Sequence, residues 1–294
     1  MRKLALNRLD AFFAGIAERE TLYLPVDTPA GAKFEPWERG KTLSDALNTV
    51  RSAKDFFFPQ TENLMDFKTE GKKIEIIDTR RECEDFVIFG VRACDVRSFD
   101  VLDKVFLSEP ADSYYKNRRE HGVIVSLACT KPHETCFCGT FGIDAASPAG
   151  DVTAWKTEDA LYLAANTEKG RALLKLVEDL TEDADEAPVA EQQKVTRARM
   201  KKLPLANLTA EKFGAGKTDE FFGDPAWAEL SQSCLGCGTC TFVCPTCQCY
   251  DIKDFNTGHG VRRFRCWDSC MYSDFTMMAH GNNRTSQMQR FRQR

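Results

Sequence analysis

The sequence predicts an α/β domain at residues 1–180, a linker at 181–225 and a small α+β domain at 226–294. Two observations lead to this division. Short segments rich in β-branched residues alternate with segments of helical periodicity through the first domain, as in proteins built on a partly parallel sheet. The 13 cysteines of the 294-residue chain also fall into two groups, at 83–138 and 234–270.

The elements of the first domain follow from local pattern. Helical spacing of Phe99, Leu102 and Phe106 predicts a helix at 95–106. The expected strands are KIEIID (73–78), DFVIFGV (85–91), GVIVSLA (122–128) and LYLAAN (161–166). Further helices are expected at 1–20, 113–121 and 170–180, and a polar connecting helix at 186–204.

Composition and charge exclude several classes of protein. No apolar run approaches the ~18 residues of a membrane span. The first 20 residues mix charged and apolar positions, which predicts an amphipathic helix rather than a signal peptide, so a cytoplasmic location is expected. The net charge of −4 gives no reason to expect nucleic acid as a partner. KFGAGKT (212–218) lacks the first glycine of a P-loop and is expected to be an ordinary loop.

The cysteine content is the most informative part of the composition. Disulfides do not persist in a reducing compartment, so 13 cysteines without a secretion signal indicate metal or redox chemistry. Only four histidines are present, which argues against His-rich zinc or copper sites. Thiolate is a soft ligand, and it favours iron–sulfur clusters or zinc.

The second cysteine group begins with the pattern C-x2-C-x2-C-x3-C-P. It runs through Cys234, Cys237, Cys240, Cys244 and Pro245. Two-residue gaps let successive thiolates converge from one tight loop, and Gly236 and Gly238 allow the backbone to wrap closely around a cluster. In this arrangement the fourth cysteine reaches a second cluster. A zinc ribbon needs two C-x2-C pairs with a longer spacer, so the pattern predicts a [4Fe-4S] site.

Four further cysteines follow this motif, and the sequence leaves their role open. They are Cys247, Cys249, Cys266 and Cys270. Each is a candidate cluster ligand, a small buried hydrophobe or part of a separate thiol site. The neighbouring run of Arg262, Arg263 and Arg265 is expected to offset the negative charge of a thiolate-bound cluster.

The first cysteine group contains a second candidate site. Its expected ligands are Cys94, Cys129, Cys136 and Cys138. Cys94 and Cys129 follow two expected strands, and the carboxyl ends of neighbouring parallel strands lie together. The alternatives are scattered buried or free thiols, or a zinc site. Cys83 lies in the charged segment TRRECEDF and is not an expected ligand.

Several stretches resemble one family of 4Fe-4S dicluster electron-transfer subunits. They are CLGCGTCTFVCPTCQCYDI, RFRCWDSCMYSDF, AHGNNRTSQMQRFRQR, FGVRACDVRSFDVLDKVF and ACTKPHETCFCGTFG. The family includes the beta subunit of sulfhydrogenases, which are soluble NiFe hydrogenases, and the corresponding subunit of anaerobic sulfite reductase. The resemblance implies a ferredoxin-like C-terminal domain and a [4Fe-4S] cluster at the first cysteine group.

One departure from the family bears on the number of clusters. The family carries a second C-x2-C-x2-C-x3-C-P after the arginine-rich stretch, and this sequence ends at Arg294 before any such motif. We expect a truncated chain; alternatively, the four further cysteines complete a second site. Two or three clusters are expected in total.

The expected function is electron relay in a cytoplasmic redox complex of hydrogenase or sulfite reductase type. The relay would connect a partner that holds a flavin, or a soluble donor, to a partner that holds the catalytic metal. No catalytic residues are expected, because the Ser and His residues form no nucleophilic constellation. The alternatives are a redox enzyme subunit that reduces thiol or sulfur substrates at the N-terminal cluster, and a zinc-bound scaffold protein.

Overall fold

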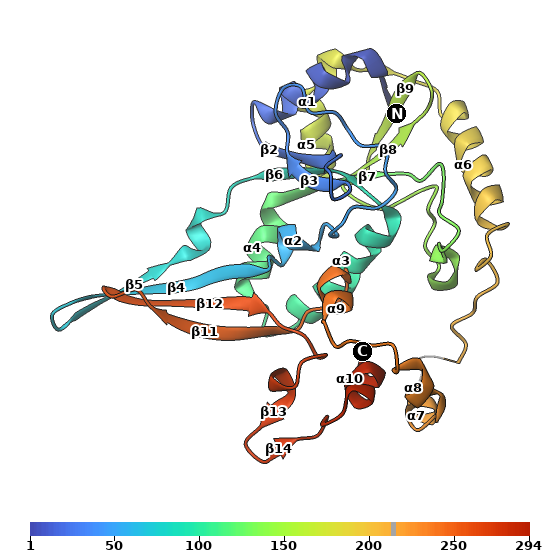
Figure 1. Cartoon of the computed structure of the whole chain (residues 1–294). Coiled ribbons are helices and arrows are strands. Elements are labelled where there is room, and N and C mark those ends of the chain that lie inside the picture. The colour runs from blue at the N-terminus through green and yellow to red at the C-terminus, as the bar shows by residue number, and fades with distance from the viewer. Residues whose placement is uncertain (213–215) are drawn as a thin grey trace. The chain divides into compact units, whose positions relative to one another are not determined.

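The computed structural model describes residues 1–212 and 216–294. Within KFGAGKT (212–218), residues 213–215 lie outside the described residues, and with them the expected loop. Figure 1 traces the chain from the N-terminus in blue to the C-terminus in red.

The chain divides into two compact units. Unit 1 comprises Met1–Phe57 and Cys83–Thr209, and unit 2 comprises Phe58–Glu82 and Ala210–Arg294. The segment that starts at Phe58 therefore packs with the C-terminal part of the chain rather than with the residues next to it in sequence.

Unit 1 is built on a mixed sheet of eight described strands in the order β10-β1-β9-β8-β7-β6-β2-β3. The strands are β1 (Arg2–Ala5), β2 (Thr21–Val26), β3 (Lys33–Pro36), β6 (Phe86–Val91), β7 (Gly122–Leu127), β8 (Val152–Lys156), β9 (Ala160–Ala165) and β10 (Glu182–Asp183). The helices are α1 (Leu9–Ala17), α2 (Lys54–Phe57), α3 (Ala93–Phe106), α4 (Ser113–His121), α5 (Glu168–Leu176) and α6 (Ala187–Met200), with short 3-10 turns η1 (Leu6–Arg8), η3 (Cys138–Phe141) and η4 (Glu178–Leu180).

The centre of this sheet is parallel, as the alternation of strands and helices predicts. β6 pairs in parallel with both β2 and β7, and β7 pairs in parallel with β8. The carboxyl ends of β6 and β7 therefore lie side by side. Every residue of these two strands is buried, because helices cover both faces of the sheet.

Two layers of apolar side chains bury the central strands. On one face, Phe12 and Ile16 of α1 pack with Val87 and Phe89 of β6, together with Leu173 of α5. On the other face the rings of Phe86, Phe57 and Phe99 pack in sequence. Figure 1 shows α1 and α5 on one side of this sheet and α3 and α4 on the other.

The expected helix at 1–20 is correct only in its second half. Residues Arg2–Ala5 form strand β1, and the helix begins at Leu9. Leu4 lies opposite Leu161 of β9 and is fully buried. The spacing of the apolar residues fits a helix, but pairing with β9 draws the first residues into the sheet.

Unit 2 contains a four-stranded antiparallel sheet in the order β11-β12-β4-β5. Its elements are β4 (Thr61–Glu70), β5 (Lys73–Asp78), η2 (Thr79–Glu82), α7 (Thr218–Phe222), α8 (Ala226–Leu230), α9 (Thr239–Val243), β11 (Tyr250–Asn256), β12 (Gly260–Trp267), η5 (Asp274–Thr276), β13 (Met277–Met278), β14 (Gly281–Asn282) and α10 (Gln287–Gln293). The expected strand KIEIID is β5, and it belongs to this sheet.

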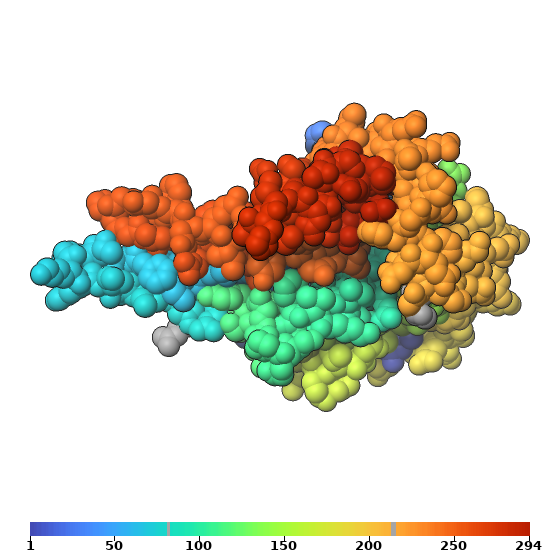
Figure 2. Space-filling view, turned by 90° about the horizontal axis from the view of Figure 1, so that it is seen from below, coloured from blue at the N-terminus to red at the C-terminus, as the bar shows by residue number. Residues whose placement is uncertain are grey.

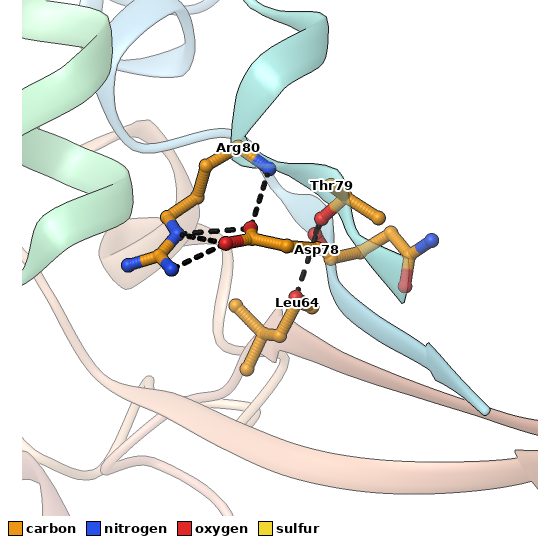
Figure 3. Close-up of polar contacts among 5 residues, drawn as sticks. Leu64, Asp78, Thr79 and Arg80 are labelled. Atoms are coloured by element: carbon orange, nitrogen blue, oxygen red, sulfur yellow. Dashed lines mark hydrogen bonds and ion pairs between the residues drawn. The ribbon is translucent and has the colours of Figure 1, made fainter. Parts of the chain in front are cut away.

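The β4 strand carries one extra residue at its pairing with β12. Arg263 lies opposite Met65 and Phe264 opposite Asn63, so Leu64 is the bulged residue. The Thr79 hydroxyl donates to the Leu64 carbonyl at 3.2 Å and to that of Asn63 at 2.7 Å (Figure 3). Figure 3 also shows the neighbouring pair of Arg80 and Asp78. Thr79 thus satisfies carbonyl groups that the bulge displaces from the ladder.

None of the helices in the described residues is both long enough and apolar enough to cross a membrane.

Candidate metal centres

The four expected ligands of unit 1 lie at the carboxyl edge of the parallel strands. Cys94 is in the first turn of α3, directly after β6, and Cys129 follows the end of β7. Cys136 and Cys138 lie on the next loop, where Cys138 opens the 3-10 turn η3. We refer to these four residues as the N-terminal thiol cluster. The parallel pairing of β6 and β7 places the two strand ends together, as the sequence predicts.

Helix α6 holds the loop that carries this cluster. The buried Thr196 hydroxyl donates to the Cys129 carbonyl at 3.0 Å, and the Arg199 guanidinium donates to the Thr130 carbonyl at 2.6 Å. Arg197 pairs with Asp144 at 2.7 Å. The expected connecting helix is therefore also a support for the loop.

The thiols of this cluster influence one another electrostatically. The Cys94 residue is exposed at the surface, yet burial around its thiol raises the pKa to about 12, with contributions from Asp95, Cys138 and Cys129. Burial also raises the pKa of Cys129 to about 11, against the lowering effect of Arg92. Like-charge coupling of this kind requires the thiols to lie near one another. Cluster binding would release the protons that these thiols hold.

The second site is the cysteine loop of unit 2, which runs from Cys234 to Cys244. Gly236 and Gly238 adopt positive φ angles of 69° and 74°. A Cβ atom on Gly238 would lie 2.6 Å from the Tyr272 hydroxyl oxygen, which itself donates to the Cys237 carbonyl at 2.9 Å. Only glycine permits this close wrapping.

Hydroxyl groups lie beside two thiols of the cysteine loop. Thr239 Oγ1 is 3.3 Å from Cys237 Sγ, and this contact lowers the pKa of the Cys237 thiol. A hydrogen bond with Cys247 and another with Thr246 lower the pKa of Cys244. Hydrogen bonds that favour the thiolate prepare these sulfur atoms to bind a metal.

Three of the four additional cysteines lie close to the cysteine loop. Cys247 is hydrogen-bonded to Cys244. Burial raises the pKa of Cys270, and the Cys249 and Cys240 thiols raise it further. Cys247, Cys249 and Cys270 therefore surround the loop, and ligation by them stays a prediction.

The arginine run of β12 is neutralised within its own sheet. Cys266 shares this strand, opposite Asp251 and Thr61. The three ion pairs are Arg262 with Asp66 at 2.9 Å, Arg263 with Asp254 at 2.7 Å and Arg265 with Glu62 at 2.5 Å. The expectation that this run offsets cluster charge is wrong, because each guanidinium already has a carboxylate partner.

The residues of the cysteine loop fit an iron–sulfur cluster in chemistry and in backbone shape. The donor set consists of thiols, and the two glycines leave a concave backbone that any side chain there would fill. Across the described residues, no three Cys, His, Asp or Glu side chains are already gathered closely enough to hold a single metal ion. Ligation by the eight expected cysteines thus stays a prediction at both sites.

The two sites predict different thiol reactivity in the iron-free, fully reduced chain. Cys94 and Cys237 are both exposed, but the pKa of Cys94 is raised and that of Cys237 is lowered. A lowered pKa populates the thiolate at lower pH, so Cys237 should react with iodoacetamide at a lower pH than Cys94. Mass spectrometry of labelled peptides across a pH series measures this order. The reverse order would contradict the electrostatics described above.

Comparison with known proteins identifies the family. The family described as a 4Fe-4S dicluster domain matches residues 233–294. The beta subunit of sulfhydrogenase 2 from Pyrococcus furiosus is 32% identical over 299 residues, which cover 99% of this chain and 86% of that subunit. The chain belongs to this beta-subunit family. No solved structure matches it.

Membership of the beta-subunit family confirms the resemblance seen in the sequence. The chain combines a mixed α/β unit with a large sheet and a C-terminal 4Fe-4S domain. Family membership does not determine the number of clusters, because the dicluster match ends with the chain at residue 294.

Sequence reasoning missed the residues that contact the thiols from elsewhere in the chain. Gln287 of α10 donates an amide hydrogen to Cys234 Sγ at 3.2 Å, and Arg294 donates to the Cys240 carbonyl at 2.8 Å. A capping box at Ser286 and Gln289 marks the start of α10 and is readable from sequence. The contact between Gln287 and sulfur has no local signal.

Proposed function

We propose that this chain is the iron–sulfur electron-transfer subunit of a cytoplasmic, multi-subunit redox complex. It would relay electrons between a partner with a flavin, or a soluble donor, and a partner with the catalytic metal of a hydrogenase or sulfite reductase. The observation that carries the proposal is the cysteine loop, in which thiols, positive-φ glycines and thiol-directed hydroxyls are combined. A bound [4Fe-4S] cluster supplies a centre that gains and loses one electron.

The chain's own residues would hold and shield these centres. In unit 2 we propose Cys234, Cys237, Cys240 and Cys244 as ligands within a ferredoxin-like domain. In unit 1 we propose the N-terminal thiol cluster, which α6 and Arg92 hold at the sheet edge. The Arg92 guanidinium donates to the carbonyls of Leu127 and Ala128 at the end of β7, and it places a positive charge near Cys129 that favours the thiolate.

The test is spectroscopic and uses the full chain purified without oxygen. We expect a brown protein that contains iron and acid-labile sulfide and gives an EPR signal after reduction with dithionite. A colourless, EPR-silent preparation would exclude the relay. Zinc without iron or sulfide would instead support a structural scaffold.

A cavity next to Cys129 favours one second candidate, a redox enzyme subunit with its own substrate site. The cavity of about 720 Å³ is lined by Arg92, Thr130, Lys131 and Gln192, among others. The amide oxygen and nitrogen of Gln192 are buried and have no hydrogen-bond partner within the described part of the chain. A polar ligand would supply those partners.

Spectroscopy with added substrates separates the two candidates. A disulfide or polysulfide that changes the N-terminal cluster signal of the isolated chain, and does so less in Gln192→Leu, would favour the substrate site. An unchanged signal with every compound would leave electron relay as the function.

A further inference from the structure

Helix α10 presents polar groups to the cysteine loop. The Gln287 side-chain amide donates to Cys234 Sγ at 3.2 Å. At the far end of the same segment, Arg294 donates to the Cys240 carbonyl at 2.8 Å. The helix is anchored by Phe291, whose ring packs 6.4 Å from that of Trp227, and by Arg292, which donates to the Phe222 carbonyl. In Figure 2 this C-terminal segment, drawn in red, is exposed at the surface.

The orientation of the Gln287 amide is fixed by its other contact. Arg290 Nη2 donates to Gln287 Oε1 at 3.2 Å, and Arg290 also donates to the Arg284 carbonyl at 2.9 Å. A guanidinium has only donors, so the atom that it contacts must be the amide oxygen. The amide nitrogen therefore faces the sulfur of Cys234 as a donor.

The backbone of the cysteine loop makes room for this amide. A Cβ atom on Gly236 would lie 2.9 Å from Gln287 Oε1, so a larger residue there would displace the amide from the sulfur. The close approach of Gln287 thus depends on the same glycine that shapes the loop.

A hydrogen bond to a ligating sulfur has a defined effect on a cluster. Reduction adds one electron, and the extra negative charge spreads onto the thiolate ligands. A donor to that sulfur favours the more negative state and raises the midpoint potential. The Arg294 guanidinium, which lies within electrostatic range of Cys240 and Cys244, acts in the same direction.

We propose that Gln287 is a tuning residue that raises the reduction potential of the cluster bound through Cys234. This inference rests on the proposed function, because it requires that cluster. Gln287 acts through the sulfur of Cys234 and needs no contact with any partner subunit.

The experiment compares Gln287→Leu with Gln293→Leu in the full chain. Gln293 lies on the same helix and is exposed, so it controls for the substitution itself. Iron and sulfide are assayed first, and midpoint potentials are then measured by EPR-monitored titration with dithionite and mediators. We expect both variants to keep the wild-type iron content, and Gln287→Leu alone to shift one midpoint potential to a lower value.

The outcomes separate this inference from the proposed function. A wild-type chain without iron or sulfide would remove the proposed function itself. A Gln287→Leu chain with full iron content and the wild-type potential would overturn the tuning role alone. If Gln287→Leu does not load its cluster, Gln287→Glu decides, because a carboxylate beside the sulfur must lower the potential further. Loss of the cluster in both variants would also overturn the proposal, since Gln287 would then serve assembly rather than tuning.

Discussion

Replacing Cys237 with Ser is expected to abolish or convert one C-terminal cluster and to stop turnover in the assembled complex. Serine offers a hydroxyl in place of the soft thiolate that iron prefers. The iron content should fall by up to one cluster, or about four iron atoms. Because relay centres act in series, loss of one centre interrupts the whole path. Iron analysis, EPR and donor-to-acceptor turnover measure the effect.

The matched control for this variant is Cys83→Ser. Cys83 is half-buried and lies outside both proposed sites, so the same change there should leave iron content and turnover at wild-type values. Full turnover with unchanged iron in Cys237→Ser would count against ligation by the cysteine loop.

Replacing Arg265 with Met is expected to destabilise unit 2 by about 3–5 kcal/mol, since it leaves the Glu62 carboxylate buried without its ion-pair partner. The two side chains are only 3% and 5% exposed and lie 2.5 Å apart. The Arg265 guanidinium also lies over the rings of Phe58 and Tyr250, and the variant loses those contacts. Hydrogen exchange of peptides from β4 and β12 measures the loss, because the two units need not unfold together.

An exposed pair on the same strand provides the control. Arg263 and Asp254 lie 2.7 Å apart with both side chains 48% exposed, so Arg263→Met should cost at most about 1 kcal/mol. The double variant Glu62→Leu with Arg265→Met should recover much of the loss, because no buried charge remains. Equal loss of protection in Arg265→Met and Arg263→Met would show that burial of the pair is unimportant.

Local pattern is enough to predict much of unit 1. The continuous apolar runs of β6 and β7 and the helical spacing in α3 correspond to elements whose ends differ by no more than two residues from those expected. The first residues were harder to predict, because helical spacing and a buried edge strand demand similar apolar residues. Leu4 joins the sheet only because β9 is available beside it.

The sheet of unit 2 had little signal in the sequence. Its strands β4 and β12 pair across the chain, as in the bond from Arg262 to Asp66, which are 196 positions apart. Charged residues at both strands weaken the alternation that would mark them. The partner of a strand is determined by packing between distant segments, and no local window contains that information.

The sequence by itself determined the chemistry of this protein. The spacing of Cys234, Cys237, Cys240 and Cys244, with glycines between them, is local and defines a loop whatever surrounds it. The tertiary structure alone decided which groups face that loop, and it brought Gln287 to the sulfur of Cys234. It also placed the strand ends that carry Cys94 and Cys129 side by side. The physical reason is that ligand spacing is written in adjacent residues, whereas the surroundings of a ligand arise from contacts between segments far apart in the chain.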